Sequence, residues 1–304
     1  MNKNFSNQPL VSVIINCFNG EKYLKKTIDS VIAQTYENWE IIFWDNQSTD
    51  QSAKIFKNYE DSRLKYFYAP NHSKILYEAK NYALEKINGD FIAFLDTDDW
   101  WFPSKLEKQM PLFEDPEVGM VYGNYFYYYE KINKTKIFRK KKLPTGYIIK
   151  KILSDYIVGS ATYMIRKKSM KSLDYQFDSK FHIIGDFDIN IRIAASCKVN
   201  CIQEPVAFMR IHGKNESILN KNLEVEEMKI WYNKMKKDKN FAIHTELEGV
   251  KKRYLYLETV ETILNYNFIK GFNKVFEYPF CFTKLKLLII LLLPKLIVRK
   301  IKNY

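Results

Sequence analysis

The first part of the chain alternates short apolar runs with stretches of helical periodicity. Apolar positions that recur every three or four residues predict helices at 24–34, 48–59 and 75–87. β-branched and aromatic runs predict buried strands at 11–15, 40–44, 64–68 and 91–95. Strands that alternate with helices form a mostly parallel, twisted sheet covered by helices on both faces. The pattern therefore predicts an α/β fold.

The second part of the chain has a different pattern of hydrophobic residues. Apolar periodicity there predicts helices at 105–113 and 187–195, and aromatic-rich runs predict strands at 119–129, 160–166 and 206–211. From Asn215 onward only helical periodicity is present. We therefore expect a catalytic domain over residues 1–215 and a helical C-terminal region over 216–304.

Composition narrows the class of protein. Hydrophobic residues make up 46% of the 304-residue chain, which predicts a folded protein, and the net charge is +13. The cations are not interleaved with aromatic residues as in RNA-binding signatures, so we expect no nucleic-acid partner. Four cysteines do not make a disulfide framework, and the polar segment Met1–Pro9 lacks the apolar core of a secretory signal. We expect a cytoplasmic enzyme.

Three carboxylates directly follow one apolar strand, where the run Phe91–Leu95 leads into Asp96, Asp98 and Asp99. In open α/β sheets, ligands bind beyond the carboxyl ends of the strands, and carboxylate oxygens there can hold a divalent cation. Such a cation can bridge the phosphates of a nucleotide diphosphate. The residues alone are equally compatible with a solvated turn that carries acidic helix caps.

Three further polar side chains stand where strands end or helices begin. Asp45 either contacts a base or ribose, or caps the helix expected from Ser48. Asp186 either takes a proton from an incoming hydroxyl, or is favoured at its position by the helix dipole. His212, after the last predicted strand, is either a metal or phosphate ligand or a structural histidine. The chain has no phosphate-binding Walker loop and no glycine-rich dinucleotide fingerprint, which argues against kinases and dehydrogenases.

These segments, in this order, resemble family 2 of the glycosyltransferases, which are inverting enzymes with the GT-A fold, and among them the bacterial-type enzymes of surface-polysaccharide and glycan assembly. The matching segments are Val11–Asn19, Ser30–Tyr36, Trp44–Asp50, Phe94–Asp99, Gly185–Arg192 and Arg210–His212. Several ordered matches are more specific than one short motif.

The resemblance implies a hexosyltransferase that moves one sugar from a nucleotide-diphosphate sugar, with uridine diphosphate as the expected leaving group, to an acceptor hydroxyl. No Gln-x-x-Arg-Trp segment follows Asp186, so we expect a non-processive enzyme. The donor would bind to residues 10–115 and the acceptor to residues 116–215. The resemblance implies Asp186 as the catalytic base, Mn²⁺ or Mg²⁺ held by Asp98, Asp99 and His212, and a donor site formed by Asn16, Phe18, Asn19, Asp45, Lys80, Asp96 and Asp98.

The chain departs from the family pattern at three places. Asn46-Gln47 stands where many members have Asp-Gly, Lys80 where many have Arg, and Gly185 where many have Glu. The departures at Gly185 and in the turn after Asp45 motivate an alternative in which the chain is a catalytically weak nucleotide-sugar-binding module that retains the same fold.

The C-terminal end combines an apolar run with positive charge. From Lys284 onward there are six cations and no carboxylate, and the seven-residue run Leu287–Leu293 is too short to span a bilayer. This pattern predicts a basic amphipathic segment on an anionic membrane surface, and so an enzyme that is peripheral on the inner face of the cell membrane. A lipid-linked or surface glycan is then the expected acceptor. A helix packed on the catalytic domain or on a second subunit is the alternative.

Overall fold

A computed structural model describes residues 8–265, 268–295 and 297–298. The chain divides into two compact units. The first comprises the chain up to Ile152 together with Tyr156–Gly213, and the second comprises Leu153–Asp155 and the chain from Lys214.

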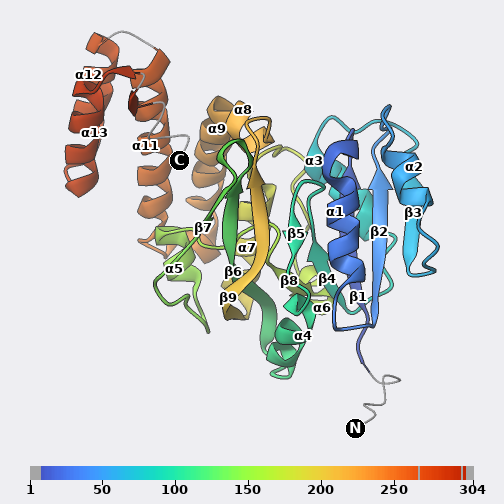
Figure 1. Ribbon diagram of the computed structural model, residues 1–304. Coiled ribbons are helices and arrows are strands. Elements are labelled where there is room, and N and C mark those ends of the chain that lie inside the picture. Colours follow the sequence, from blue (N-terminus) through green and yellow to red (C-terminus); the bar gives the residue numbers. More distant parts are fainter. Residues whose placement is uncertain (1–7, 266–267, 296, 299–304) are drawn as a thin grey trace. The chain divides into compact units, whose positions relative to one another are not determined.

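The described part of the first unit is built on a nine-stranded sheet (Figure 1). The strands are β1 (Val11–Cys17), β2 (Trp39–Asp45), β3 (Leu64–Tyr68), β4 (Phe91–Phe94), β5 (Trp100–Trp101), β6 (Val118–Tyr129), β7 (Lys134–Ile137), β8 (Met164–Arg166) and β9 (Lys198–Ile211). Their order is β3-β2-β1-β4-β8-β6-β9-β5, with β7 paired to β6. Strands β1 to β4 are parallel, β6 is parallel to β9, and β8, β5 and β7 run antiparallel to their neighbours.

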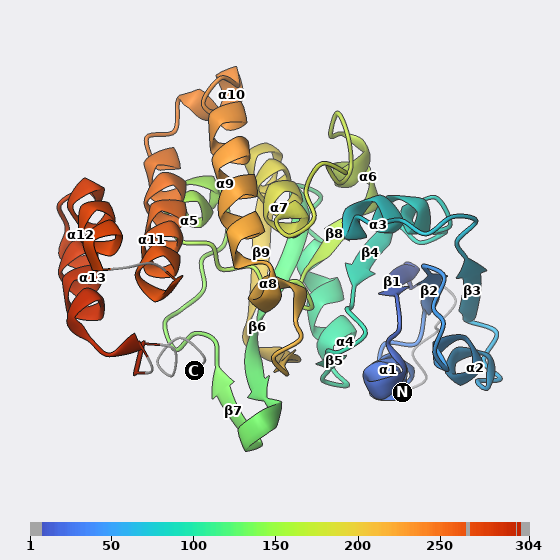
Figure 2. The same cartoon turned by 90° about the horizontal axis from the view of Figure 1, so that it is seen from above.

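Helices cover both faces of this sheet. In the view of Figure 2, α1 and α2 lie on one side of the parallel strands and α3 on the other. The helices of this unit are α1 (Glu21–Ile32), α2 (Ser52–Lys57), α3 (Leu76–Leu84), α4 (Lys105–Gln109), α5 (Ile149–Ser154, whose end enters the second unit), α6 (Lys167–Lys171) and α7 (Gly185–Ser196). Short 3-10 turns cover Met110–Phe113 and Glu130–Ile132. The predicted α/β fold with a mostly parallel sheet is confirmed.

The inner strands are mostly apolar and are buried along nearly their whole length, because both sheet faces are covered. Strand β2 is buried at every position, and β1 is buried at all but Asn16. Helix α1 places Leu24, Ile28 and Val31 at helical spacing against the sheet.

One buried carboxylate lies at the amino end of β2. Glu40 accepts hydrogen bonds from Ser12 Oγ at 2.6 Å, Lys65 Nζ at 2.5 Å and Asn88 N at 2.7 Å. Burial alone would raise the pKa of the Glu40 carboxyl, but these donors lower it to about 2. Glu40 is therefore a fully compensated buried charge at the edge of the sheet opposite to Asp45.

Several predicted boundaries were wrong. The helix expected from Ser48 begins at Ser52, because residues 46–50 form a turn. The strand expected at 160–166 is limited to Met164–Arg166, and the strand expected at 206–211 is the second half of the longer β9. Strands β5 and β7 were not predicted, since β5 has only two residues and β7 is an exposed hairpin arm.

The described part of the second unit is helical. Its helices are α8 (Glu216–Leu219), α9 (Lys221–Met235), α10 (Lys239–Ala242), α11 (Leu247–Asn265), α12 (Phe268–Glu277) and α13 (Phe282–Leu292). Val260, Ile263, Val275, Leu287 and Leu291 form the core between α11, α12 and α13. Within the described ranges, no helix has the length and apolarity to cross a bilayer. Three of the six C-terminal cations, Arg299, Lys300 and Lys302, lie outside the described residues.

Candidate active site

The strand register brings the predicted site segments to one edge of the sheet. Cys17 pairs with Asp45 across β1 and β2, and Ile14 pairs with Phe94 across β1 and β4. The three strands therefore end side by side, and the segment Asp96–Asp99 follows β4 directly. This is the edge at which ligands bind in open α/β sheets.

Asp45 is buried and both its carboxylate oxygens have partners. Oδ1 accepts the Ser48 backbone N–H at 2.7 Å, and Oδ2 accepts the Tyr66 hydroxyl at 2.6 Å. Asp45 therefore fixes the turn after β2 and does not cap α2. Each oxygen keeps a lone pair that could accept from a base or a ribose.

The turn after β2 keeps a left-handed residue where the family pattern has glycine. Gln47 has φ 67°, a left-handed backbone conformation that is strained for any residue other than glycine. Its side-chain amide donates to the Ala69 and Pro70 carbonyls at 3.2 and 3.1 Å, and these bonds help to hold the conformation. The departure at Gln47 thus leaves the bond between Ser48 and Asp45 intact.

The end of β1 carries an amide without a partner. Both polar side-chain atoms of Asn16 are buried and lack a hydrogen bond among the described residues. A buried polar group left in this state costs about 1–3 kcal/mol, which is the usual signature of a site completed by a ligand or water. Asn19 is committed to the neighbouring turn, since its Oδ1 accepts the Thr49 N–H at 2.8 Å. The exposed Phe18 ring lies 4.6 Å from the His72 ring, centre to centre.

Asp186 stands in the first turn of α7, and three side chains hold its carboxylate. Tyr163 donates to Oδ1 at 2.5 Å and Tyr77 donates to Oδ2 at 3.0 Å. Lys80 Nζ lies 3.4 Å from both oxygens. Burial and then the Asp186 charge raise the pKa of both phenols, so they stay protonated and donate. The side chain of Asp186 remains 15% exposed and can meet a substrate.

Tyr77 explains the departure at Gly185. A Cβ atom at Gly185 would lie 2.4 Å from the Tyr77 ring, so no side chain fits there without moving that ring. The same tyrosine donates to Asp186. The space that a glutamate would need is filled by a residue that orients the candidate base.

The second acid of the same helix turn is committed to structure. Asp188 is fully buried, and its Oδ2 accepts from Arg192 Nη2 at 2.7 Å and Nε at 2.9 Å. Arg192 also donates to the carbonyls of Tyr175 and Gln176. Asp186 is therefore the acid of this turn that remains accessible.

Lys80 links Asp186 to the acidic run. Its Nζ also lies 3.7 Å from Asp96 Oδ1, and its side chain is only 3% exposed. Burial lowers the pKa of Lys80, but the charges of Asp186 and Asp96 outweigh burial and raise it. Burial raises the pKa of Asp96, and the charges of Asp186 and Asp98 raise it too. The positive charge of Lys80 lowers it but does not outweigh these effects, so the pKa of Asp96 is raised overall. The Asp96 side chain is 35% exposed.

Asp98 and Asp99 have different surroundings. His212 Nε2 lies 3.0 Å from Asp98 Oδ2, and both side chains are partly accessible. Asp99 is buried, and its Oδ1 accepts the Arg210 backbone N–H at 2.8 Å. Burial and repulsion from Asp98 and Asp96 raise the pKa of Asp99 well above its ordinary value. The structure thus concentrates negative charge here, beyond what Arg210 offsets.

A divalent cation fits the chemistry of these donors only in part. Asp98 offers a carboxylate and His212 an imidazole, a mixed set that Mn²⁺ accepts readily, whereas Mg²⁺ prefers oxygen. Within the described ranges, no group of three or more His, Cys, Asp or Glu side chains is arranged to hold a metal ion. One oxygen of Asp99 is already occupied by the Arg210 amide. Phosphate oxygens and water would have to complete the coordination.

No pattern in the sequence predicted the tyrosines that donate hydrogen bonds to Asp45 and Asp186. Tyr77 lies in α3, Tyr66 in β3, and Tyr163 directly before β8. They are separated from their partner carboxylates by 109, 21 and 23 residues. The only hint was Gly185, where the family pattern has a larger residue.

The fold and the residues at this edge of the sheet define an enzyme of the GT-A type. The chain belongs to glycosyltransferase family 2: the family model "Glycosyl transferase family 2" matches residues 12–173. It is therefore a glycosyltransferase, as the sequence resemblance predicts.

Relatives with known names are similar over the first part of the chain. UDP-Glc:alpha-D-GlcNAc-diphosphoundecaprenol beta-1,3-glucosyltransferase WfgD of Escherichia coli is 33% identical over 171 residues, which are 56% of this chain and 66% of WfgD. TuaG of Bacillus subtilis, named for teichuronic acid biosynthesis, is 32% identical over 163 residues, 53% of this chain and 64% of TuaG. The matches span just under two thirds of each relative.

Solved structures share the fold over most of the chain. TarS of S. aureus, residues 1–349, superposes with a TM-score of 0.66 at 18% identity, covering 84% of this chain and 74% of TarS. The mannosyltransferase PcManGT from Pyrobaculum calidifontis, solved with GDP-Man and Mn²⁺, gives 0.64 at 14% identity, covering 99% of this chain and 89% of PcManGT. These likenesses confirm the predicted GT-A fold.

Proposed function

We propose that the chain is a non-processive inverting hexosyltransferase that moves one sugar from a UDP-sugar to an acceptor hydroxyl of a lipid-linked or surface glycan. The observation that carries this proposal is the orientation of the accessible Asp186 carboxylate by Tyr77, Tyr163 and Lys80. WfgD, which uses UDP-Glc and a diphosphoundecaprenol acceptor by its name, supports the donor and acceptor classes.

Asp186 would take the proton from the acceptor hydroxyl as its oxygen attacks the anomeric carbon. One carboxylate oxygen must turn toward the hydroxyl, and the donors on the other keep the group in place. Lys80, with its Nζ 3.4 Å from Asp186 Oδ1 and 3.7 Å from Asp96 Oδ1, would stabilise the negative charge of both carboxylates. Direct displacement at the anomeric carbon then inverts its configuration.

The donor would lie along the strand ends in the half formed by residues 10–115, with the acceptor in residues 116–215. Asn16 would gain the partner that its amide lacks, and Asp45 would accept from the base or ribose. Phe18 and Asn19 would border the nucleotide, and Lys80, Asp96 and Asp98 would border the diphosphate and sugar.

Mn²⁺ or Mg²⁺ would be held by Asp98 and His212, with Asp99 beside them, and it would stabilise the negative charge of the leaving diphosphate. The Mn²⁺ in PcManGT supports this assignment. Arg210 fixes the backbone of this segment, because its Nε donates to the Asp98 carbonyl at 2.9 Å.

Two observations support an enzyme over the alternative of a binding module. Tyr77 fills the space at Gly185, and the turn after Asp45 keeps its geometry with Gln47.

We also propose that the helical region from residue 216 holds the enzyme at the inner face of the membrane, where a lipid-linked acceptor lies.

A panel of nucleotide sugars tests the proposal. Thermal shifts with and without Mn²⁺ would select the donor, and release of its nucleotide would then be measured with and without undecaprenyl-diphosphate acceptors. We expect metal-dependent stabilisation by one UDP-sugar and slow hydrolysis of it. Binding without turnover across all donors and acceptors would instead favour the binding module.

A further inference from the structure

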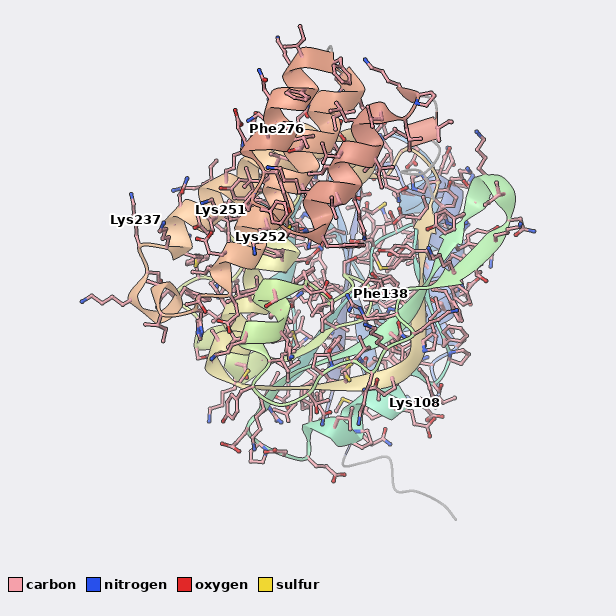
Figure 3. The ribbon with its side chains drawn as sticks, turned by 90° about the vertical axis from the view of Figure 1, so that its left-hand side faces the viewer. Lys108, Phe138, Lys237, Lys251, Lys252 and Phe276 are labelled. Atoms are coloured by element: carbon pink, nitrogen blue, oxygen red, sulfur yellow. The ribbon has the colours of Figure 1, made fainter. Side chains whose placement is uncertain are left out.

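Helix α12 presents a ladder of phenylalanine rings to solvent. Phe268, Phe272 and Phe276 follow one another at four-residue spacing and are between 41% and 58% exposed. Neighbouring ring centres lie 6.2 and 4.4 Å apart, so the rings form a continuous row. Gly271 and Val275 lie on the adjacent side of the same helix and are buried, Val275 in the core that α11, α12 and α13 form. Phe276 is labelled in Figure 3.

Helix α13 is apolar on two sides. Leu287 and Leu291 are buried against α11 and α12. A second stripe is between 50% and 76% exposed and consists of Phe282, Leu285, Ile289 and Leu292. Most of the apolar run expected to lie on a membrane is thus used by the helical core, which contains Leu287 and Leu291 and against which Leu288, Ile290 and Leu293 pack. A helix with an apolar stripe on each side needs two partners, and the hairpin core supplies only one.

Positive charge borders these exposed stripes. Lys284 Nζ lies 5.4 Å from the Phe276 ring and Lys286 Nζ lies 5.3 Å from the Phe282 ring. No acidic residue occurs between Tyr278 and the end of the chain. Lysine ammonium groups beside large apolar side chains suit the boundary between acyl chains and anionic headgroups.

We infer that the outer stripes of α12 and α13 form a membrane-binding face whose partner is an anionic lipid bilayer. We name this set of residues the Phe face: Phe268, Phe272, Phe276, Phe282, Leu285, Ile289 and Leu292. The charge favours an anionic bilayer over a second copy of the hairpin, because Lys284 and Lys286 border the Phe face and Glu277, the one acid of α12, is paired with Lys274. The proposed function, with its lipid-linked acceptor, explains why membrane binding would be useful to the enzyme. The evidence for membrane binding itself does not depend on that acceptor.

Vesicle flotation of the purified full-length chain tests this inference. Vesicles of phosphatidylcholine with phosphatidylglycerol would be compared with vesicles of phosphatidylcholine alone. The test variant combines Phe272→Ser with Phe276→Ser. The control combines Leu219→Ser with Ile230→Ser, which removes two exposed apolar side chains from α8 and α9 of the same unit.

We expect the wild type and the control to float with anionic vesicles, and binding of the test variant to fall at least about tenfold. Circular dichroism would verify that both variants are folded. Equal flotation of the test variant and the wild type would overturn the inference. So would a wild-type dimer that ignores vesicles and becomes monomeric in the test variant.

Donor hydrolysis without vesicles separates this inference from the proposed function. The Phe face contains none of the proposed site residues, so the test variant should hydrolyse the donor at the wild-type rate. Vesicle binding without any hydrolysis by the wild type would refute the proposed function and leave the membrane face standing.

Discussion

The two acidic regions of the site differ in how their charge is balanced. Around Asp186, a buried lysine and two phenols meet one accessible carboxylate. Around Asp98 and Asp99, burial and then repulsion between neighbouring carboxylates raise the pKa of Asp99 well above its usual range. This difference supports the proposal that the first region supplies the base and the second binds a cation.

Loss of the base should have the largest effect. Asp186→Asn keeps the shape of the side chain but cannot take a proton, so transfer should fall about thousandfold. Donor affinity, measured by titration calorimetry, should stay within about threefold of the wild type. The exposed Asp174→Asn serves as the control and should transfer normally. Normal turnover by Asp186→Asn would remove this residue from its role.

Glu40 shows what full compensation of a buried charge contributes to folding. Its pKa is lowered from 4.5 to about 2, so its contribution is present above about pH 4.5 and is lost as pH falls toward 2. The contribution at neutral pH is roughly 3 kcal/mol.

Glu40→Gln should therefore lower the free energy of unfolding at pH 7 and flatten its change with pH between 5 and 2. Urea denaturation over that range would measure both. An unchanged slope would show that another group carries the acid sensitivity.

Removal of Lys80 should leave the region around Asp186 without a balancing cation, as in the region around Asp98 and Asp99. Lys80→Met leaves Asp186 and Asp96 without the buried cation between them. Transfer at pH 7 should fall roughly thirtyfold, and the acid limb of the pH–rate profile should move to higher pH, because unpaired carboxylates bind protons more readily. Lys80→Arg should restore most of the profile. A loss of rate with no movement of the acid limb would indicate a merely structural role.

A substitution at Asp98 should affect metal-dependent binding of the nucleotide. Asp98→Asn should weaken Mn²⁺-dependent binding of UDP about tenfold or more, while metal-free binding stays unchanged. Asp90→Asn, an exposed change at the amino end of the same strand, is the control. Calorimetric titration in the presence of manganese would measure both. Equal affinities for all three proteins would count against the metal assignment.

The sequence predicted the parts of the site that local pattern controls. Strand ends carry Asp45 and Asp96–Asp99, and a helix start carries Asp186, because apolar runs and turns are encoded within a few residues. The Ser48 helix start failed because Asp45, Asn19 and Gln47 tie the turn to other segments. The phenols could not be predicted, since their contacts depend on how distant strands pack.

The configuration of the first-formed product tests the central claim most directly. Proton NMR would follow the enzyme with its preferred α-linked UDP-sugar and acceptor, and the anomeric coupling of the new linkage would give its configuration. A base at Asp186 without a covalent intermediate predicts a β-linked product at the earliest time point. An α-linked first product would contradict direct displacement by an acceptor that Asp186 activates.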